Sequence, residues 1–266
     1  QAFVTVVGET STGKSTLVNS LLAARLLPAD AVPTTGTVTQ IVCAEEGVDR
    51  MFAIFKNASQ EELDSARFEA QTCEPAPTLL KLKLLTSRAG HGFAGFNVFD
   101  TPGFNSIISE HGEVLRTILP ETDVLVLVAG YRTGFGQHDQ DLFELVQNAV
   151  DSDPDFPVFL VVNRIPDQVE PNDRRLREIV RNAQDSVRRP FEVLLVKSTP
   201  VKPNGSHELP ETGPLWTRVH ASARSQERQT VVDAKLGTRL AALADLMLDS
   251  AEIRLLSYSL DEDVLA

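Results

Sequence analysis

The sequence predicts an α/β fold in which helices cover both faces of a mostly parallel central sheet. Apolar runs that are typical of strands alternate along the chain with segments of helical periodicity. These runs are continuous in Val, Leu and Phe, as in strands that are buried on both faces. A glycine-rich loop also separates the first predicted strand from the first predicted helix, and such loops lie at the carboxyl edge of parallel sheets.

The predicted strands and helices follow one another in a regular order. The apolar runs place strands at residues 3–7, 38–43, 51–55, 79–85, 96–99, 123–128, 158–162 and 193–196. The helical patterns place helices at residues 15–26, 60–70, 113–119, 137–150, 173–187 and 215–223. For residues 45–95 as a whole we expect an extended strand pair and a surface helix.

After residue 223 the pattern changes to a single amphipathic stripe. Apolar residues recur there every three to five positions, at Val231, Leu236, Leu240, Leu243, Met247, Ile253 and Leu256. The 266 residues are therefore predicted to form one large domain, residues 1–223, and a helical segment, residues 224–266. This segment either folds back on the domain or begins a longer helical bundle.

Residues 8–15 have the phosphate-binding pattern G-x-x-x-x-G-K-S, directly between a strand and a helix. Gly8 and Gly13 allow a tight turn whose backbone N–H groups point at a β-phosphate at the start of the helix. Lys14 then reaches the β- and γ-phosphate oxygens, and the Ser15 hydroxyl binds Mg²⁺. We therefore expect a nucleoside triphosphate site formed by Gly8, Glu9, Thr10, Ser11, Thr12, Gly13, Lys14, Ser15 and Thr16.

Two further segments fit the γ-phosphate side of such a site. Residues 33–39, Pro-Thr-Thr-Gly-Thr-Val-Thr, form a threonine-rich loop that can complete Mg²⁺ coordination. Asp100 ends an apolar strand and begins the sequence Asp-Thr-Pro-Gly. Its carboxylate can hold the metal through water, and the Gly103 N–H can sense the γ-phosphate. Together with the phosphate loop, these segments are in the order that a GTPase requires.

The segment Asn163-Arg164-Ile165-Pro166-Asp167 stands where an N-K-x-D motif would read a guanine base. Asn163 is present, and Arg164 can lay its stem over a purine face as lysine would. Pro166 occupies the expected Asp position, so the carboxylate that would bind the guanine N1 and N2 hydrogens is displaced to Asp167. Ser198, after the last predicted strand, can supply the remaining contact with the base.

Composition limits the class of partner. The formal net charge of −12 disfavours direct binding to nucleic acid, and the basic run at 174–177 is typical of a solvated helix face. Two Cys residues are too few for a disulfide framework and suit a cytoplasmic protein, and the scattered His residues make a zinc site improbable. No apolar run is long enough to span a membrane. Gln1 leads directly into a strand, so we expect a shortened or processed chain.

The sequence resembles the dynamin superfamily, and bacterial dynamin-like proteins in particular. The resemblance rests on three segments and on the spacing from them to Asn163: residues 6–22 around the phosphate loop, Leu-Pro-Ala-Asp-Ala-Val-Pro-Thr-Thr-Gly-Thr-Val-Thr at 27–39, and Phe-Asp-Thr-Pro-Gly-Phe-Asn-Ser at 99–106. It covers most of the chain, although residues 45–95 match poorly.

The resemblance implies a large GTPase that hydrolyses GTP with Mg²⁺ when two GTPase domains, identical or paralogous, meet across their nucleotides. It implies that Ser11 positions the catalytic water and that Thr39 is the switch threonine. The implied metal set is Ser15, Thr39 and Asp100, and the implied catalytic set is Ser11, Lys14, Thr39 and Gly103.

The resemblance also implies a monovalent cation and a membrane. Backbone carbonyls around Gly36 and Gly103 would help to hold K⁺ or Na⁺. Hydrolysis would move a helical trunk and remodel or fuse membrane, through parts that are not in these 266 residues. The implied location is the cytoplasm, with a peripheral position at the inner face of the cell membrane.

Two other functions stay open at the level of sequence. Because Pro166 disturbs the base motif, the chain could be an atypical ATPase, although Asn163 and the Asp-Thr-Pro-Gly segment argue against this. It could also be a nucleotide-gated scaffold with little hydrolysis, against which the intact Lys14 argues. Glu110 and His111 are weaker catalytic candidates, and Arg132 could pair across a dimer contact.

Overall fold

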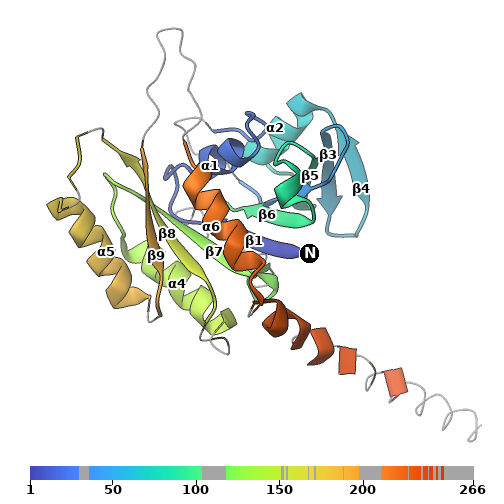
Figure 1. The fold of residues 1–266 in the computed structure, drawn as a ribbon. Coiled ribbons are helices and arrows are strands. Elements are labelled where there is room, and N and C mark those ends of the chain that lie inside the picture. The colour runs from blue at the N-terminus through green and yellow to red at the C-terminus, as the bar shows by residue number, and fades with distance from the viewer. Residues whose placement is uncertain are drawn as a thin grey trace, which may run out of the picture. The chain divides into compact units, whose positions relative to one another are not determined.

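The computed structural model contains a single sheet that positions the predicted site. It describes residues 1–29, 36–103, 118–150, 153, 155–166, 168–170, 172–187, 189–197, 211–226, 228–234, 236–238, 240, 241, 244, 247 and 248. Within these residues nine strands form one sheet, in the order β4-β3-β5-β2-β6-β1-β7-β8-β9 (Figure 1). The five pairs β1 with β6, β1 with β7, β2 with β5, β7 with β8, and β8 with β9 are parallel, which confirms the predicted α/β class.

The strands and helices have the following bounds. The strands are β1 Ala2–Val7, β2 Thr39–Cys43, β3 Arg50–Phe55, β4 Gln60–Leu63, β5 Leu79–Thr86, β6 Phe96–Asp100, β7 Val124–Gly130, β8 Val158–Ile165 and β9 Glu192–Lys197. The helices are α1 Lys14–Leu21, α2 Ser65–Cys73, α4 Gln137–Val150, α5 Arg174–Ser186 and α6 Gly213–Ala223. Two single 3₁₀ turns, His91–Phe93 and Leu119–Glu121, complete the described elements.

Helices cover both faces of the sheet. One apolar cluster joins side chains of β1, β2, β5 and β6 to Leu17 of α1, Phe68 of α2 and Trp216 of α6. The other joins β7 and β8 to Phe143 of α4 and Ile179 of α5. Because continuous apolar strands bury both of their faces, the sheet supplies a rigid base for the loops at its carboxyl edge.

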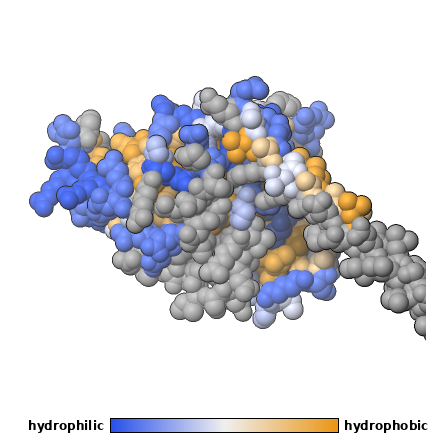
Figure 2. Space-filling model, turned by 90° about the horizontal axis from the view of Figure 1, so that it is seen from below, coloured by the Kyte–Doolittle hydropathy of each residue, from blue (hydrophilic) through white to orange (hydrophobic). Residues whose placement is uncertain are grey.

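Helix α5 carries the basic run of the sequence on its solvent side. It buries Leu176, Ile179 and Ala183, while Arg174 and Arg177 are exposed, as expected for a solvated face. Seen from below, hydrophilic residues gather on the left of the molecule, on the side where Figure 1 places α5 (Figure 2).

The prediction of a helix over residues 60–70 was wrong in its first half. Gln60–Leu63 is strand β4, which pairs antiparallel with β3, and α2 begins only at Ser65. The side chain of Asp64 accepts a hydrogen bond from the Arg67 N–H at 2.8 Å and caps the helix, so the change from strand to helix occurs at this residue. Strands β3, β4 and β5 with α2 agree with the strand pair and surface helix expected for residues 45–95, with one strand more.

The first helix is shorter than predicted, because it ends at Leu21 and not at residue 26. Asn19, which is fully buried, donates to the Leu27 carbonyl and accepts from the Leu26 and Leu27 N–H groups. These contacts turn the chain away from the helical path. The helix predicted over residues 113–119 lies almost wholly outside the described residues, and the turn Leu119–Glu121 contains Pro120.

The chain divides into two compact units, Gln1–Ala223 and Arg224–Ala266. In the second unit the described positions from Gln226 to Leu248 are helical. Leu236, Leu240, Met247 and Leu248 are exposed in this unit. Among the described residues, no helix is both long and apolar enough to cross a membrane.

Candidate functional site

The phosphate loop joins the end of β1 at Val7 to the start of α1 at Lys14. Gly13, the N-terminal cap of α1, has a left-handed backbone with φ 93°, which glycine adopts without strain. A Cβ at Gly13 would also overlap the side-chain nitrogen of Asn163, so only glycine fits. Ser11 is exposed and has φ 62°, a conformation that strains a residue with a Cβ. The loop therefore places the start of α1 at the carboxyl edge of the sheet.

The side chain of Lys14 is buried against the phosphate loop. Its ammonium donates to the Gly8 carbonyl at 3.0 Å and to the Glu9 carbonyl at 2.9 Å. Burial lowers its pKa to about 8, and the carboxylates of Asp100, Asp139 and Glu9 oppose that decrease. The side chain thus stays mostly protonated at neutral pH, and the phosphate oxygens of a nucleotide can replace the two carbonyls as its acceptors.

Ser15, Thr39 and Asp100 meet beside the phosphate loop. The Ser15 hydroxyl donates to Asp100 Oδ2 at 2.6 Å, and Thr39 lies directly opposite Asp100 in the β2–β6 pair. Both Thr39 and Asp100 are almost fully buried. Among the described residues, Thr39 Oγ1 and Asp100 Oδ1 have no hydrogen-bond partner.

These unpaired oxygens fit a small hard cation. Burial raises the pKa of Asp100 to about 6, while the Ser15 hydroxyl and Lys14 oppose the increase. Two hydroxyl oxygens and one carboxylate are ligands of the kind that Mg²⁺ takes when phosphate oxygens and water complete its shell. The residues present therefore fit the Mg²⁺ ion that the sequence predicts.

The segment that begins at Asp100 lies directly against the phosphate loop. The Thr101 hydroxyl donates to the Val6 carbonyl at 2.8 Å, which ties this segment to the end of β1. A Cβ at Gly103 would overlap the side chain and the Cα of Thr10, so the backbone at Gly103 packs directly against Thr10 of the phosphate loop. Gly36, in contrast, donates its N–H to the Thr72 carbonyl at 2.7 Å and lies at the end of α2.

The base-side residues also contact the phosphate loop. Asn163 donates from Nδ2 to the Thr12 carbonyl at 2.8 Å, and its Oδ1 accepts the Arg164 N–H at 2.8 Å. Arg164 is exposed, with φ 60°. Thr16 is half-buried in the first turn of α1. Asp167, Ser198, Glu110 and His111 lie outside the described residues.

Asp139 is a buried carboxylate of the site that sequence reasoning missed. It lies in the first turn of α4 and is fully buried, and its charge acts on Lys14. The sequence offered one signal, an acidic residue in the first turn of a helix that follows a buried strand. Acids are common in first turns, because they stabilise helix N-termini, so the signal alone did not distinguish Asp139 from a surface cap.

The chain is similar to known proteins in sequence. A sequence profile of the Dynamin family matches residues 4–165, more than half of the chain. Mitofusin FZO1 of Saccharomyces cerevisiae (strain ATCC 204508 / S288c) is 30% identical over 152 residues, which are 47% of this chain and 18% of that protein. Dynamin-like protein A of Bacillus subtilis (strain 168) is 24% identical over 168 residues, 62% of this chain and 13% of that protein.

The fold has a counterpart among solved structures. A structure of an oligomerised bacterial dynamin pair, described as sensing and tethering membranes over long range, aligns with a TM-score of 0.54 and 15% identity. The alignment covers 74% of this chain and 33% of that one. At this identity the likeness concerns the fold alone. The chain spans less than a fifth of the mitofusin and of the dynamin-like protein, and a third of the solved chain.

Proposed function

The chain belongs to the dynamin family, and from this premise we propose that it is the GTPase part of a dynamin-like protein, converting GTP to GDP and phosphate. One observation carries the proposal. The Ser15 hydroxyl is bonded to a buried Asp100 beside Lys14, and the oxygens Thr39 Oγ1 and Asp100 Oδ1 are unpaired among the described residues. Buried polar atoms normally have partners, so their lack of one supports a ligand at this position.

Each residue of the site has a role that follows from its chemistry. Lys14 and the N–H groups of the phosphate loop bind the β- and γ-phosphates. Ser15, Thr39 and Asp100 would hold Mg²⁺, which would neutralise charge on the phosphates. Ser11 orients the water whose oxygen attacks the γ-phosphorus, while the bond from that phosphorus to the β–γ bridging oxygen breaks. The Gly103 N–H would contact the γ-phosphate and sense its loss.

The base is proposed to lie between β8 and the phosphate loop. Asn163 already contacts that loop, and the exposed Arg164 side chain is free to cover a purine face. Asp167 and Ser198 are proposed to contact the guanine edge. This assignment would make the site prefer GTP although Pro166 stands in the usual place of the acid.

The assembly that we propose follows the family. Two such domains, identical or paralogous, would meet through their nucleotide sides, and backbone carbonyls around Gly36 and Gly103 would help to hold K⁺ or Na⁺, which would supply charge compensation. The helical unit after Ala223 would be the start of a trunk, and parts outside these residues would contact membrane. The proposed location is the cytoplasm, at the inner face of the cell membrane.

Hydrolysis of GTP and ATP, measured side by side over a hundredfold range of protein concentration, tests the proposal. We expect turnover that is selective for GTP, that rises per molecule with protein concentration, and that Lys14→Ala abolishes. Selective ATP turnover would instead support the atypical ATPase. Binding of GTP without turnover at any concentration would support the nucleotide-gated scaffold.

A further inference from the structure

Asp139 is placed unlike an ordinary helix cap. Its Oδ2 accepts the Gly136 N–H at 3.0 Å, which is the contact that an acid three residues into a helix makes with the capping residue. Such acids usually lie in solvent, whereas Asp139 is fully buried. A cap alone therefore does not account for its second carboxylate oxygen.

The carboxyl of Asp139 lies near the phosphate loop, because Glu9 and Lys14 of that loop act on its pKa. Oδ1 makes no hydrogen bond of normal geometry among the described residues. Burial raises the pKa of this carboxyl, and the Glu9 carboxylate raises it too, whereas the Gly136 N–H, the backbone of Glu9 and the ammonium of Lys14 lie near enough to lower it. A Cβ at Gly136 would lie 3.3 Å from Glu9 Oε1, so the start of α4 and the phosphate loop are in contact at this point.

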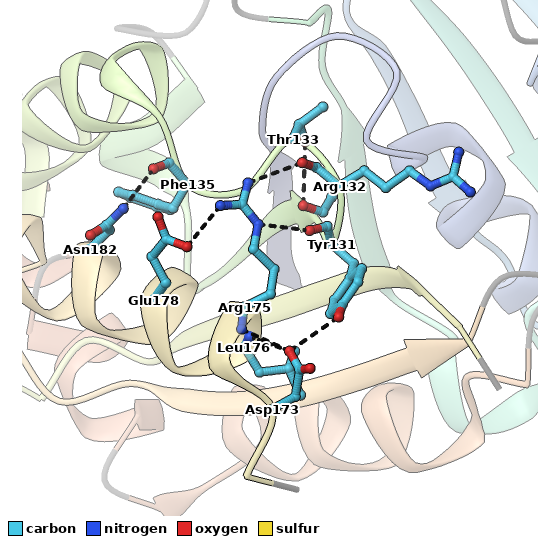
Figure 3. Close-up of polar contacts among 10 residues, drawn as sticks. Tyr131, Arg132, Thr133, Phe135, Asp173, Arg175, Leu176, Glu178 and Asn182 are labelled. Atoms are coloured by element: carbon cyan, nitrogen blue, oxygen red, sulfur yellow. Dashed lines mark hydrogen bonds and ion pairs between the residues drawn. The ribbon is translucent and has the colours of Figure 1, made fainter. Parts of the chain in front are cut away.

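The loop Tyr131–Gly136, which leads from β7 into α4, is fixed from its other side by α5. Arg175 donates from Nε to the Tyr131 carbonyl at 3.3 Å and from Nη2 to the Arg132 carbonyl at 3.0 Å (Figure 3). Its third contact, with Glu178 on the same helix at 3.0 Å, orients the guanidinium. The planar fork of Arg175 thus holds two successive carbonyls of the loop.

Further contacts complete this attachment. The Tyr131 hydroxyl donates to Asp173 at 3.1 Å, and Asn182 donates to the Phe135 carbonyl at 3.4 Å (Figure 3). Gly134 has φ 83°, a backbone conformation that strains a residue with a Cβ, and a Cβ there would lie 2.7 Å from Arg175 Nη2. The Arg132 side chain points away from α5 in the same view. These contacts fix the loop on α5, and the loop in turn fixes the start of α4, where Asp139 lies.

We propose that Asp139 is a positioning residue for the phosphate loop: anchored through the loop Tyr131–Gly136 to α5, it holds the Glu9 backbone and Lys14 in place for a nucleotide. The proposal rests on the proposed function and adds to it a residue outside the phosphate-loop motif. A carboxylate is costly here, because burial raises its pKa to about 6, and an amide of the same size could still accept the Gly136 N–H. We therefore assign the negative charge of Asp139 a role in nucleotide binding and not in the stability of the fold.

The test is the variant Asp139→Asn, with Asp123→Asn as its matched control. Asp123 is also a buried carboxylate that accepts a backbone N–H, from Phe3 at 2.9 Å, but it lies at the amino ends of β1 and β7, opposite the phosphate loop. An amide at 139 can still accept the Gly136 N–H through its oxygen, but its nitrogen is a donor and can attract neither the Glu9 N–H nor the Lys14 ammonium. The readouts are the dissociation constants for GDP and GTP and the Tm of the full chain.

We expect Asp139→Asn to weaken GDP and GTP binding by about tenfold each while its Tm does not fall. Asp123→Asn should keep the affinity of the unchanged protein. Arg175→Ala should weaken both nucleotides in the same direction as Asp139→Asn, whereas Arg177→Ala, on the exposed face of α5, should not. The double variant of Asp139 and Arg175 should lose less than the product of the two single losses, because both act through one loop.

Equal affinity of Asp139→Asn and Asp123→Asn would overturn the proposal, and so would a loss of affinity that merely follows a lower Tm. Failure of the proposed function is recognised separately. It would show as unchanged nucleotide binding in Lys14→Ala or as selectivity for ATP. GDP and ADP are bound by the same phosphate loop, so the comparison of the two Asp variants gives its answer whichever base the site prefers.

Discussion

At the scale of single residues, the site buries several charged side chains, and burial of a charge is unfavourable for folding. Asp100 and Asp139 are both fully buried, and burial raises the pKa of each to about 6. Lys14 interacts electrostatically with both carboxylates, and its own burial lowers its pKa to about 8. Buried groups of opposite charge with shifted pKa values, gathered beside a phosphate loop, are typical of functional sites. Burying these charges lowers the stability of the free protein, and a bound ligand can offset that loss.

The first prediction concerns the stability of Asp139→Asn against pH. The raised pKa means that the folded state binds more protons than the unfolded state between about pH 4 and pH 6, so wild-type stability decreases as pH rises through this range. Above pH 6 the full cost of the charge is present. We expect Asp139→Asn to be more stable by about 1–3 kcal/mol at pH 7.5 and by little at pH 4. Urea unfolding without nucleotide at both pH values measures this, and a variant less stable at pH 7.5 would contradict it.

The second prediction concerns Ser11. Because its backbone is already left-handed, Ser11→Gly removes the hydroxyl without new strain and should raise stability by about 1 kcal/mol. If the hydroxyl orients the attacking water, GTP turnover should fall by about 100-fold with the affinity for GDP unchanged. Steady-state kinetics and GDP titration separate the two effects. Turnover equal to that of the wild type would remove Ser11 from the catalytic set.

At the scale of elements, local side-chain contacts set the ends of some helices and strands, which the hydrophobic periodicity of the sequence did not predict. Asp64 separates β4 from α2, and Asn19 ends α1, each by bonding backbone groups within eight residues. Such polar contacts leave no trace in the spacing of apolar residues along the sequence. Because the apolar strands and helices are long and regular, the remaining order of elements was predictable from the sequence, including the position of the phosphate loop.

The same reasoning explains what could be predicted of the site. Lys14, Ser15 and Asp100 belong to short motifs whose chemistry fixes their spacing in the sequence, and the structure brings them together. Asp139 comes near the phosphate loop because β7 and β1 are parallel neighbours, so the segments that follow the two strands lie at the same edge of the sheet. No sequence pattern predicts that these two segments are neighbours. The roles of Asp167 and Ser198 stay predictions, since both lie outside the described residues.

The third prediction tests Asn19 as the residue that ends α1. It is fully buried and makes three hydrogen bonds to the turn at Leu26 and Leu27. Asn19→Ala leaves two N–H groups and a carbonyl without these partners, so we expect a loss of about 2–4 kcal/mol in the free energy of unfolding. Urea denaturation measures it, with Ser59→Ala on an exposed turn as the control. A loss no larger than that of the control would contradict the assignment.

At the scale of the whole molecule, all described site residues lie in the first unit, Gln1–Ala223. The second unit exposes three leucines and a methionine at its described helical positions. The net charge of −12 disfavours electrostatic attraction of the chain as a whole to nucleic acid or to an anionic membrane.

The fourth prediction follows from this division. A chain that ends at Ala223 keeps α6, whose Trp216 and Val219 belong to the apolar cluster over the sheet. We expect it to fold and to bind GTP within about threefold of the affinity of the full chain. Calorimetric titration of both chains provides the comparison. Loss of binding in the shorter, folded chain would show that the second unit contributes to the site.

The most direct test of the central claim is equilibrium binding of GTP in the presence of Mg²⁺, compared between the wild type and Lys14→Ala. The account predicts that the wild type binds GTP, that removal of Mg²⁺ by chelation weakens this binding, and that Lys14→Ala does not bind. Undiminished binding by Lys14→Ala would contradict the account, because the nucleotide would then lie somewhere other than the phosphate loop.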